Sequence, residues 1–215
     1  MTADNQSRGY GDANPVLTAS FAGFKNGETL ATSGVTGSPN LTTTATSSSA
    51  PGTFPIAAAP GTLASANYTF TLVNGTLTVN KATLTVTADD KSRGYGDANP
   101  TFSATFSGFK NGDTLASVTG SASFATTATG SSVAGTYPIT VAAGTLSSAN
   151  YTFAFVPGTL TISKAALSVV ADNQLRGYGD ANPTLTVTYS GFKNGDTFPT
   201  SVTGAPSVTL SLIHI

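Results

Sequence analysis

The chain has 215 residues, of which only 9% are charged, and its formal net charge is −1 with a pI near 5.6. A chain with so little charge offers no basic field for nucleic acid or an anionic membrane surface, and no apolar run approaches the roughly 18 residues of a membrane span. The absence of cysteine excludes a disulfide framework and thiolate metal sites.

The chain is built from three copies of one sequence unit. The segment RGYGDANP occurs three times, with its tyrosines at Tyr10, Tyr95 and Tyr178, which are 85 and then 83 residues apart. GFKNGET at Gly23–Thr29 recurs with the same two offsets as GFKNGDT. A period above about 50 residues exceeds the usual range of solenoid repeats. Each unit is therefore expected to be a small domain.

The boundaries between units follow from where apolar residues fall along the strands. Leu77 and Val79 occupy odd positions, whereas Leu84 and Val86 occupy even positions. A strand changes its buried face only at a bend or where the core changes, so the Lys81-Ala82 step is expected to join two domains. Because this step is too short for a flexible linker, consecutive units are expected to form a semi-rigid, extended array. The predicted repeats are residues 1–80, which lack most of the first strand, residues 81–163, which are complete, and residues 164–209, which are truncated.

The hydrophobic period within each unit is two, which predicts strands. In the second unit, apolar residues alternate with Thr or Ser over Thr83–Ala88 and Phe102–Ser107, and a Thr-rich strand follows at Ser121–Thr129. The last alternating run of this part is Gly135–Val141. It contains Pro138, which cannot donate a ladder hydrogen bond, so this strand is predicted to lie at a sheet edge, as is its counterpart with Pro55 in the first unit.

One short helix and one hairpin complete the predicted unit. After the turn signal Asn111-Gly112, Asp113 is positioned to cap one or two helical turns that end at Val118. Near the end of the first unit, Asn74-Gly75 separates two β-rich runs by two residues, which is typical of a type I′ hairpin. Pairing outward from this turn places Phe70 opposite Val79. The second unit repeats the register with Phe153 opposite Ile162, although Pro157-Gly158 there implies a different turn type.

These elements predict a fold that is mainly β. We expect tandem small modules, each with a mixed or antiparallel sheet and one short helix, in a β-grasp-like arrangement. An immunoglobulin-like β-sandwich is the alternative. Residues 210–215, LSLIHI, have no counterpart in the repeats and resemble the translation of an adapter used in preparing sequencing libraries. They are excluded from fold reasoning, and with them the chain's one histidine, His214.

Four motifs together resemble a known family. RGYGDANP, SGFKNGDT, SANYTF and NGTLTVNKA are similar to the MBG domain of the YGX type, a repeat of large bacterial surface proteins that include filamentous-haemagglutinin-like adhesins. The resemblance covers nearly all of Thr2–Leu210. It implies an exported, cell-surface location and a role in adhesion or in holding an adhesive tip away from the cell. It implies no catalytic residue and no cofactor, and the expected partners are the neighbouring repeats of the same chain.

The YGDANP signature is also a candidate ligand loop, for which glycans or mucin are the alternative partners. Turn chemistry accounts for each of its residue types, because glycine permits a tight backbone path and Asp and Asn bond nearby amides. The structural interpretation is therefore preferred. Local ion pairs are expected between Arg93 and Asp97 and between Lys110 and Asp113. The candidate ligand residues are Tyr10, Asp12, Tyr95, Asp97, Tyr178 and Asp180.

Metal binding and catalysis are the remaining classes of function to be considered. Asp89, Asp90 and Asp97 are a candidate calcium set, but Asp90 is replaced by Asn5 and Asn173 in the other copies and the EF-hand spacing is absent. We expect no metal. The repeats contain neither His nor Cys, so an activated serine would need a lysine base, and no serine–lysine motif stands out. We therefore expect a protein that is not an enzyme.

Overall fold

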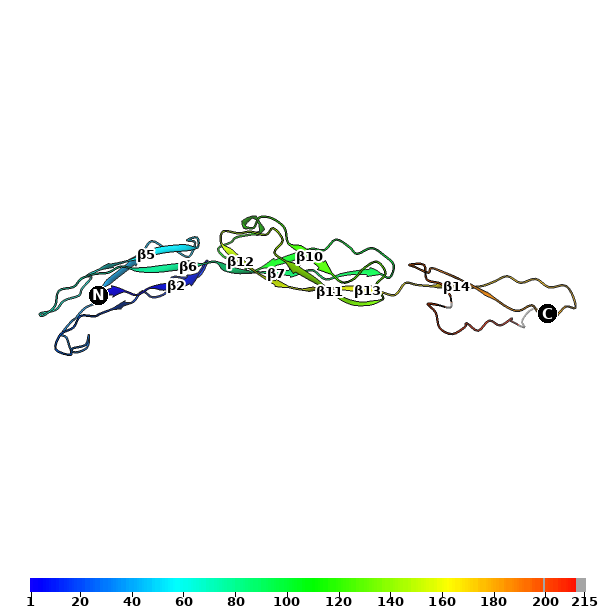
Figure 1. The fold of residues 1–215 in the computed structure, drawn as a ribbon, viewed down its shortest axis with the longest axis horizontal. Coiled ribbons are helices and arrows are strands. Elements are labelled where there is room, and N and C mark those ends of the chain that lie inside the picture. Colours follow the sequence, from blue (N-terminus) through cyan, green and yellow to red (C-terminus); the bar gives the residue numbers. More distant parts are fainter. Residues whose placement is uncertain (199, 212–215) are drawn as a thin grey trace. The chain divides into compact units, whose positions relative to one another are not determined.

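The computed structural model describes residues 1–198 and 200–211, and in this part of the chain the regular structure is almost entirely β-strand (Figure 1). The prediction of a mainly β protein is confirmed. No helix among the described residues is long and apolar enough to cross a membrane. Segment 212–215, with His214, lies outside the described residues. The chain divides into two compact units: Met1–Thr87, Ala104–Ser123 and Ala142–Val156 form the first, and Ala88–Ser103, Phe124–Val141 and the chain from Pro157 onward form the second.

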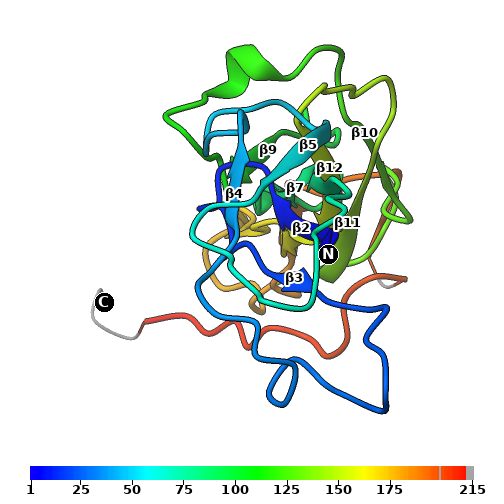
Figure 2. The ribbon, with the colours of Figure 1, turned by 90° about the vertical axis from the view of Figure 1, so that its left-hand side faces the viewer.

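The first repeat contributes a four-stranded mixed sheet to the first unit. Its order is β2 (Gln6–Gly9), β6 (Gly75–Asn80), β5 (Gly52–Ala59) and β4 (Asn40–Thr43), with β2 parallel to β6 and the other pairs antiparallel. Figure 2 labels β2, β4 and β5 of this sheet. The short strands β1 (Thr2–Ala3) and β3 (Ala19–Ser20) form a separate antiparallel pair. Because side chains alternate along β6, Leu77 and Val79 face inward, and Leu77 packs with Ile56 and Ala3 in a core cluster.

The second repeat contributes a three-stranded sheet to the same unit. Its order is β12 (Tyr151–Val156), β7 (Ala82–Ala88) and β9 (Ala104–Ser107), and β12 runs parallel to β7 with Tyr151 opposite Ala82. Leu84 and Val86 on β7 are fully buried. The odd and even sets of apolar residues are thus both buried, as their alternation predicts. Val79, Ala82 and Leu84 belong to one cluster, so the change of face occurs within a single core that residues of both repeats share.

The second unit repeats the same sheet pattern. β10 (Ser123–Thr126), β11 (Gly135–Ala142), β13 (Gly158–Ser163) and β8 (Lys91–Gly94) form a four-stranded mixed sheet in that order. Its buried apolar side chains include Ile139, Val141, Leu160 and Ile162. The third repeat adds an antiparallel pair, β14 (Ser168–Ala171) with β15 (Val187–Ser190).

The predicted hairpin is wrong. β12 and β13 follow each other in the sequence, but β12 pairs with β7, whereas β13 pairs with β11 and β8. A type I′ turn at Asn74-Gly75 needs positive φ angles at both residues, and neither residue has one. Instead, a Cβ atom on Gly158 would lie 2.3 Å from the carbonyl oxygen of Ala88, and one on Gly75 would lie 2.5 Å from that of Ala3. These glycines mark close approaches of two backbones.

This close approach predicts a large effect for Gly158→Ala. The added methyl group overlaps a backbone oxygen that cannot rotate away, and overpacking of this kind costs about 1–3 kcal/mol. Gly130→Ala is the matched control, because a Cβ there meets nothing within 4 Å and its φ is not in the left-handed region. We expect urea denaturation to show a clear loss of stability for Gly158→Ala and no loss for Gly130→Ala. Equal stability of the two variants would contradict the strand pairing.

Two smaller predictions are also corrected. β5 and β11 lie inside their sheets, not at an edge, although the pairing of β5 with β4 begins only at Ile56, so Pro55 lies just outside that ladder. The expected helix is a single 3₁₀ turn, η1 (Leu115–Ser117). Its cap is Thr114, whose side chain accepts from the Ala116 N–H at 3.4 Å, because the Asp113 carboxylate has other partners.

Candidate functional site

The YGDANP loop begins where β2 ends beside β6. The Tyr10 N–H donates to the Asn80 carbonyl at 2.8 Å, which fixes the tyrosine next to the start of the second repeat. The Asp12 N–H closes a tight turn onto the Gly9 carbonyl at 3.2 Å. Gly11 sits in this turn with a φ of +83°, a conformation that glycine adopts without a steric penalty.

A buried arginine holds the base of the loop. The Arg8 side chain is 7% exposed, and its Nε donates to Asn14 Oδ1 at 2.7 Å while its Nη1 and Nη2 donate to the carbonyls of Gly9 and Thr46. Asn14 in turn donates to the Ala45 carbonyl at 2.6 Å. Neutral acceptors therefore satisfy this buried cation, as its burial requires.

The Tyr10 ring enters a site formed by the second repeat, which we call the tyrosine socket and define as Phe109, Asp113 and Tyr151. Tyr10 is 5% exposed, and its ring meets that of Tyr151 edge to face, with centroids 5.7 Å apart. Phe109 packs on Tyr151 in the same way at 5.8 Å. The rings lie in one cluster with Val79 of the first repeat. Tyr10 is therefore a core residue that both repeats share.

One carboxylate joins the two tyrosines. Asp113 Oδ2 accepts hydrogen bonds from the hydroxyls of Tyr151 at 2.8 Å and Tyr10 at 3.1 Å. The Lys110 N–H also donates to the Tyr151 hydroxyl at 2.9 Å, which fixes the orientation of that group. Burial raises the pKa of the Tyr151 phenol, so the phenol stays protonated and keeps its proton for Asp113.

The rims of the two loops also interlock. Lys110 Nζ lies 3.2 Å from Asp12 Oδ1, and Asn111 Nδ2 donates to the Ser47 carbonyl at 3.1 Å. A Cβ atom on Gly11 would lie 2.4 Å from the Cβ of Lys110, so only glycine allows this approach. Because both charged side chains are about half exposed, their ion pair contributes only about 0–1 kcal/mol. These exposed contacts orient the two loops relative to each other, and the buried Tyr10 contributes most of the stability of the junction.

The second unit contains the same arrangement around Tyr95. Lys193 Nζ lies 3.4 Å from Asp97 Oδ1, and Asn194 Nδ2 donates to the Gly130 carbonyl at 3.2 Å. Tyr95 is half-buried, and it lines a cavity of about 140 Å³ together with Leu167, Phe192 and Asp196. Its loop rests on an arginine as before, since Arg93 donates to Asn99, Gly94 and Thr129. Tyr95 is therefore only partly enclosed.

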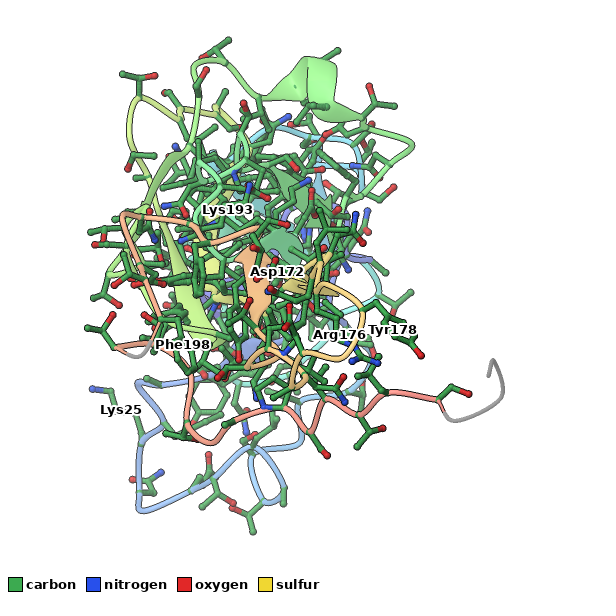
Figure 3. All side chains as sticks on the ribbon, turned by 90° about the vertical axis from the view of Figure 1, so that its right-hand side faces the viewer. Lys25, Asp172, Arg176, Tyr178, Lys193 and Phe198 are labelled. Atoms are coloured by element: carbon green, nitrogen blue, oxygen red, sulfur yellow. The ribbon has the colours of Figure 1, made fainter. Side chains whose placement is uncertain are left out.

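The third copy of the loop is open to solvent. Tyr178 is fully exposed and lies beside Arg176 at the margin of the view in Figure 3. Asp180 Oδ2 accepts from the Gly177 N–H at 3.1 Å, and the Arg176 guanidinium donates to the Asp180 carbonyl at 2.5 Å. The loop thus keeps its own turn, and no second loop of the described residues packs on it. The three candidate tyrosines are buried, half-buried and exposed in chain order.

The locally expected ion pairs are replaced by pairs between repeats. Lys110 forms an ion pair with Asp12, not with Asp113, and Asp97 forms one with Lys193. Arg93 instead donates hydrogen bonds to neutral oxygens. Sequence reasoning therefore missed that RGYGDANP and GFKNGDT form one interface. The available signal was that each repeat carries both motifs once, with an acidic residue in one and a lysine in the other. That the YGDANP loop binds a ligand stays a prediction.

The candidate calcium carboxylates have separate partners. Asp89 Oδ2 accepts from the Ser103 hydroxyl at 2.5 Å, and Asp90 Oδ1 accepts from the Thr159 N–H at 2.7 Å. Asp97 pairs with Lys193. Over residues 1–198 and 200–211, no three acidic or histidine side chains group as a metal site would require.

Asp113 gives the junction a dependence on pH. Hydrogen bonds from Tyr151 and then Tyr10 hold the pKa of Asp113 below its ordinary value of 3.8, against the opposing effect of burial. A carboxyl group with a lowered folded-state pKa stabilises the fold above its unfolded pKa, and this stabilisation is lost as the pH falls through the folded value.

We therefore expect the urea midpoint to fall as the pH drops below about 3.8, and to fall less in Asp113→Asn, which does not titrate. Asp4 and Asp172, whose pKa values are lowered by hydroxyl hydrogen bonds, are present in both proteins. The difference between the two pH profiles thus reports Asp113 alone. Superimposable profiles would show that the carboxylate does not hold the junction.

The fold and the site together define a tandem-repeat β protein whose modules meet through a tyrosine and a carboxylate. The family model of the MBG domain (YGX type) matches residues 1–78, 84–161 and 167–211, and the chain therefore belongs to this family. No curated protein matches the chain.

Proposed function

We propose that the chain is a non-enzymatic spacer of a bacterial cell-surface adhesin, which projects an adhesive region away from the cell. One observation carries this proposal: in the first unit, the signature tyrosine of one repeat, Tyr10, is buried against residues of the next repeat. A loop that holds repeats together serves the mechanical continuity of the chain.

The energetics of the junction support a spacer. Edge-to-face aromatic pairs contribute about 0.5–1.5 kcal/mol beyond the burial of their area, and Tyr151 takes part in two such pairs, with Tyr10 and with Phe109. In tandem-repeat proteins, stability is the sum of the intrinsic repeat stabilities and the interface terms between neighbours. A buried interface between neighbours therefore stabilises both repeats and resists bending at their junction.

Membership in the MBG family and the junction chemistry support the other parts of the proposal. The family resemblance implies that proteins carrying this repeat are surface proteins. This favours an exported location for the chain. The groups with shifted pKa values at the junction, Asp113 and Tyr151, are engaged with each other and with Tyr10. Their role is structural, and we propose no catalytic one.

The proposal is tested by binding and by location. We expect the whole chain to show no saturable binding to a panel of mucins, glycans and matrix proteins, and antibodies against it to label intact cells of the organism that encodes it. Tyr178→Ala is the informative variant, because this exposed tyrosine is the signature residue most accessible to a ligand. Saturable binding that this variant loses, with an unchanged circular dichroism spectrum, would replace the spacer by a glycan- or mucin-binding module.

A further inference from the structure

Each repeat carries an Asn-Gly dipeptide at the tip of its GFKNG segment. The three asparagines, Asn26, Asn111 and Asn194, all have a φ of +53°, and the glycine after each also has a positive φ. In the second repeat, the Asp113 N–H donates to the Lys110 carbonyl at 2.8 Å and closes a β-turn. Positive φ angles at both central residues make this turn type I′.

The glycine of this turn is unhindered. A Cβ atom on Gly112 would meet nothing within 4 Å, and no group of the described residues accepts a hydrogen bond from the Gly112 N–H. The Asn111 side chain before it is exposed. Because glycine has no Cβ atom to obstruct an approach, the Gly112 nitrogen can reach Cγ of Asn111 when the turn opens.

An approach of this kind leads to loss of the side-chain amide, and asparagine is thermolabile for this reason. The Gly112 nitrogen gives its proton to hydroxide or a buffer base and bonds to Asn111 Cγ. The Cγ–Nδ2 bond breaks, and ammonia leaves with a proton taken from water. Water then opens the resulting cyclic imide. Opening at Cγ yields aspartate, and opening at the main-chain carbonyl carbon yields isoaspartate. Nothing is oxidised or reduced, so water is the only co-reactant.

We propose that Asn111 is a site of spontaneous deamidation and that both products loosen the junction between the first two repeats. Asn111 Nδ2 donates to the Ser47 carbonyl of the first repeat at 3.1 Å. An aspartate at this position has no proton to donate, so two acceptor oxygens face each other and the contact is lost. The aspartate product therefore removes one contact between the repeats.

The isoaspartate product acts on the tyrosine socket. It adds a methylene group to the main chain just before Asp113, so the turn from the Lys110 carbonyl to the Asp113 N–H cannot keep its geometry. Asp113 Oδ2 accepts the hydroxyl hydrogen bonds of Tyr10 and Tyr151. Displacement of Asp113 therefore breaks the bonds that join the two tyrosines.

The third repeat holds a second site of the same kind. A Cβ atom on Gly195 would meet nothing within 4 Å, and Asn194 Nδ2 donates to the Gly130 carbonyl at 3.2 Å. Deamidation of Asn194 is expected to remove this contact within the second unit. The inference concerns the lifetime of the junctions and does not depend on the spacer role proposed above.

The chain also contains a protected Asn-Gly dipeptide, Asn74-Gly75. Gly75 is buried, and a Cβ atom there would lie 2.5 Å from the Ala3 carbonyl oxygen. Asn74 Oδ1 accepts from the Ala58 N–H at 3.0 Å. The packed glycine nitrogen and the held side chain cannot approach each other without local unfolding. Asn74 is therefore the internal control for Asn111.

Incubation of the whole chain at mildly alkaline pH, followed by peptide mapping with mass spectrometry, tests the site. A fresh sample digested in parallel corrects for deamidation during digestion. Asn111 and Asn194 are expected to exchange their amide for a carboxylate at least about tenfold faster than Asn74, a ratio that needs only a modest difference in activation free energy. Equal rates at Asn111 and Asn74 would overturn the assignment.

The effect on the junction is measured against Asn111→Gly, which accepts the positive φ and has no amide to lose. Circular dichroism of the fresh proteins establishes that both are folded. Ageing is expected to lower the urea midpoint of the unaltered chain more than that of Asn111→Gly, and to raise the reactivity of Tyr10 toward tetranitromethane only in the unaltered chain. Equal changes in the two proteins would overturn the proposed loosening, whatever the rate of deamidation.

Discussion

Replacing Tyr10 by alanine is expected to lower the stability of the first unit by about 3–5 kcal/mol, the range found for truncating a buried aromatic side chain. The ring is 5% exposed and lies in the cluster that the first two repeats share, so its removal leaves a cavity between them. Asp113 also loses one of its two tyrosine hydroxyls. Urea denaturation of the whole chain, followed by circular dichroism, measures the loss.

The chain provides its own control for this prediction. Tyr178→Ala removes the same residue from the same RGYGDANP segment, but at a fully exposed position, and surface substitutions of this kind stay within about 0.5 kcal/mol. Hydrogen exchange should also show faster exchange in Tyr10→Ala at the Lys110 amide, which donates to the Tyr151 hydroxyl. Equal effects of the two substitutions would mean that Tyr10 is not a junction residue.

Replacing Arg93 by methionine is expected to destabilise the second unit by about 3 kcal/mol, because the hydrogen bonds of a charged donor are each worth about 1.5–3 kcal/mol and their partners stay behind. Arg93 is 8% exposed and donates to Asn99 at 2.8 Å, to Gly94 at 3.0 Å and to Thr129 at 2.5 Å. Methionine fills much of the volume but replaces none of these bonds.

Two further substitutions make the result specific. Arg93→Lys keeps the charge, but its single nitrogen cannot reach three acceptors in the planar arrangement of a guanidinium, so we expect it to recover only part of the loss. Arg176→Met alters the equivalent residue of the third repeat, which is exposed and bonds the Asp180 carbonyl, and it should be nearly neutral. If Arg93→Met were as mild as Arg176→Met, the arginine would not be what holds the loop.

The strands could be predicted because their signal is local. The alternation over Thr83–Ala88 and Gly135–Val141 reflects one buried face, and the structure places strands at both. The pairing of those strands is not local. Gly75 and Gly158 suggest a turn in any short window, and the second copy repeats the ambiguity of the first without resolving it. These glycines are explained only by the close approach of the Ala3 backbone to Gly75 and of the Ala88 backbone to Gly158. Both alanines lie far away in the sequence.

The sequence indicates which loop belongs to the candidate site, but not which residues pack against that loop. The signature loop was identified from its repetition, and its turn chemistry was predicted from residue types. Its partners lie about one repeat away, since Tyr10 and Asp113 are separated by 103 positions. Lys110 and Asp113, only three positions apart, were the more obvious pair by spacing. Without the fold, nothing in the sequence ranks the distant pair above the local one.

Nitration of the whole chain with tetranitromethane, mapped by mass spectrometry, tests directly whether the signature tyrosine joins one repeat to the next. Tyr10, Tyr95 and Tyr178 lie in the same RGYGDANP context, so their intrinsic reactivities match, and no cysteine competes for the reagent. We expect rapid modification of Tyr178, slower modification of Tyr95 and protection of Tyr10. Equal rates at the three tyrosines in the folded chain would contradict this expectation.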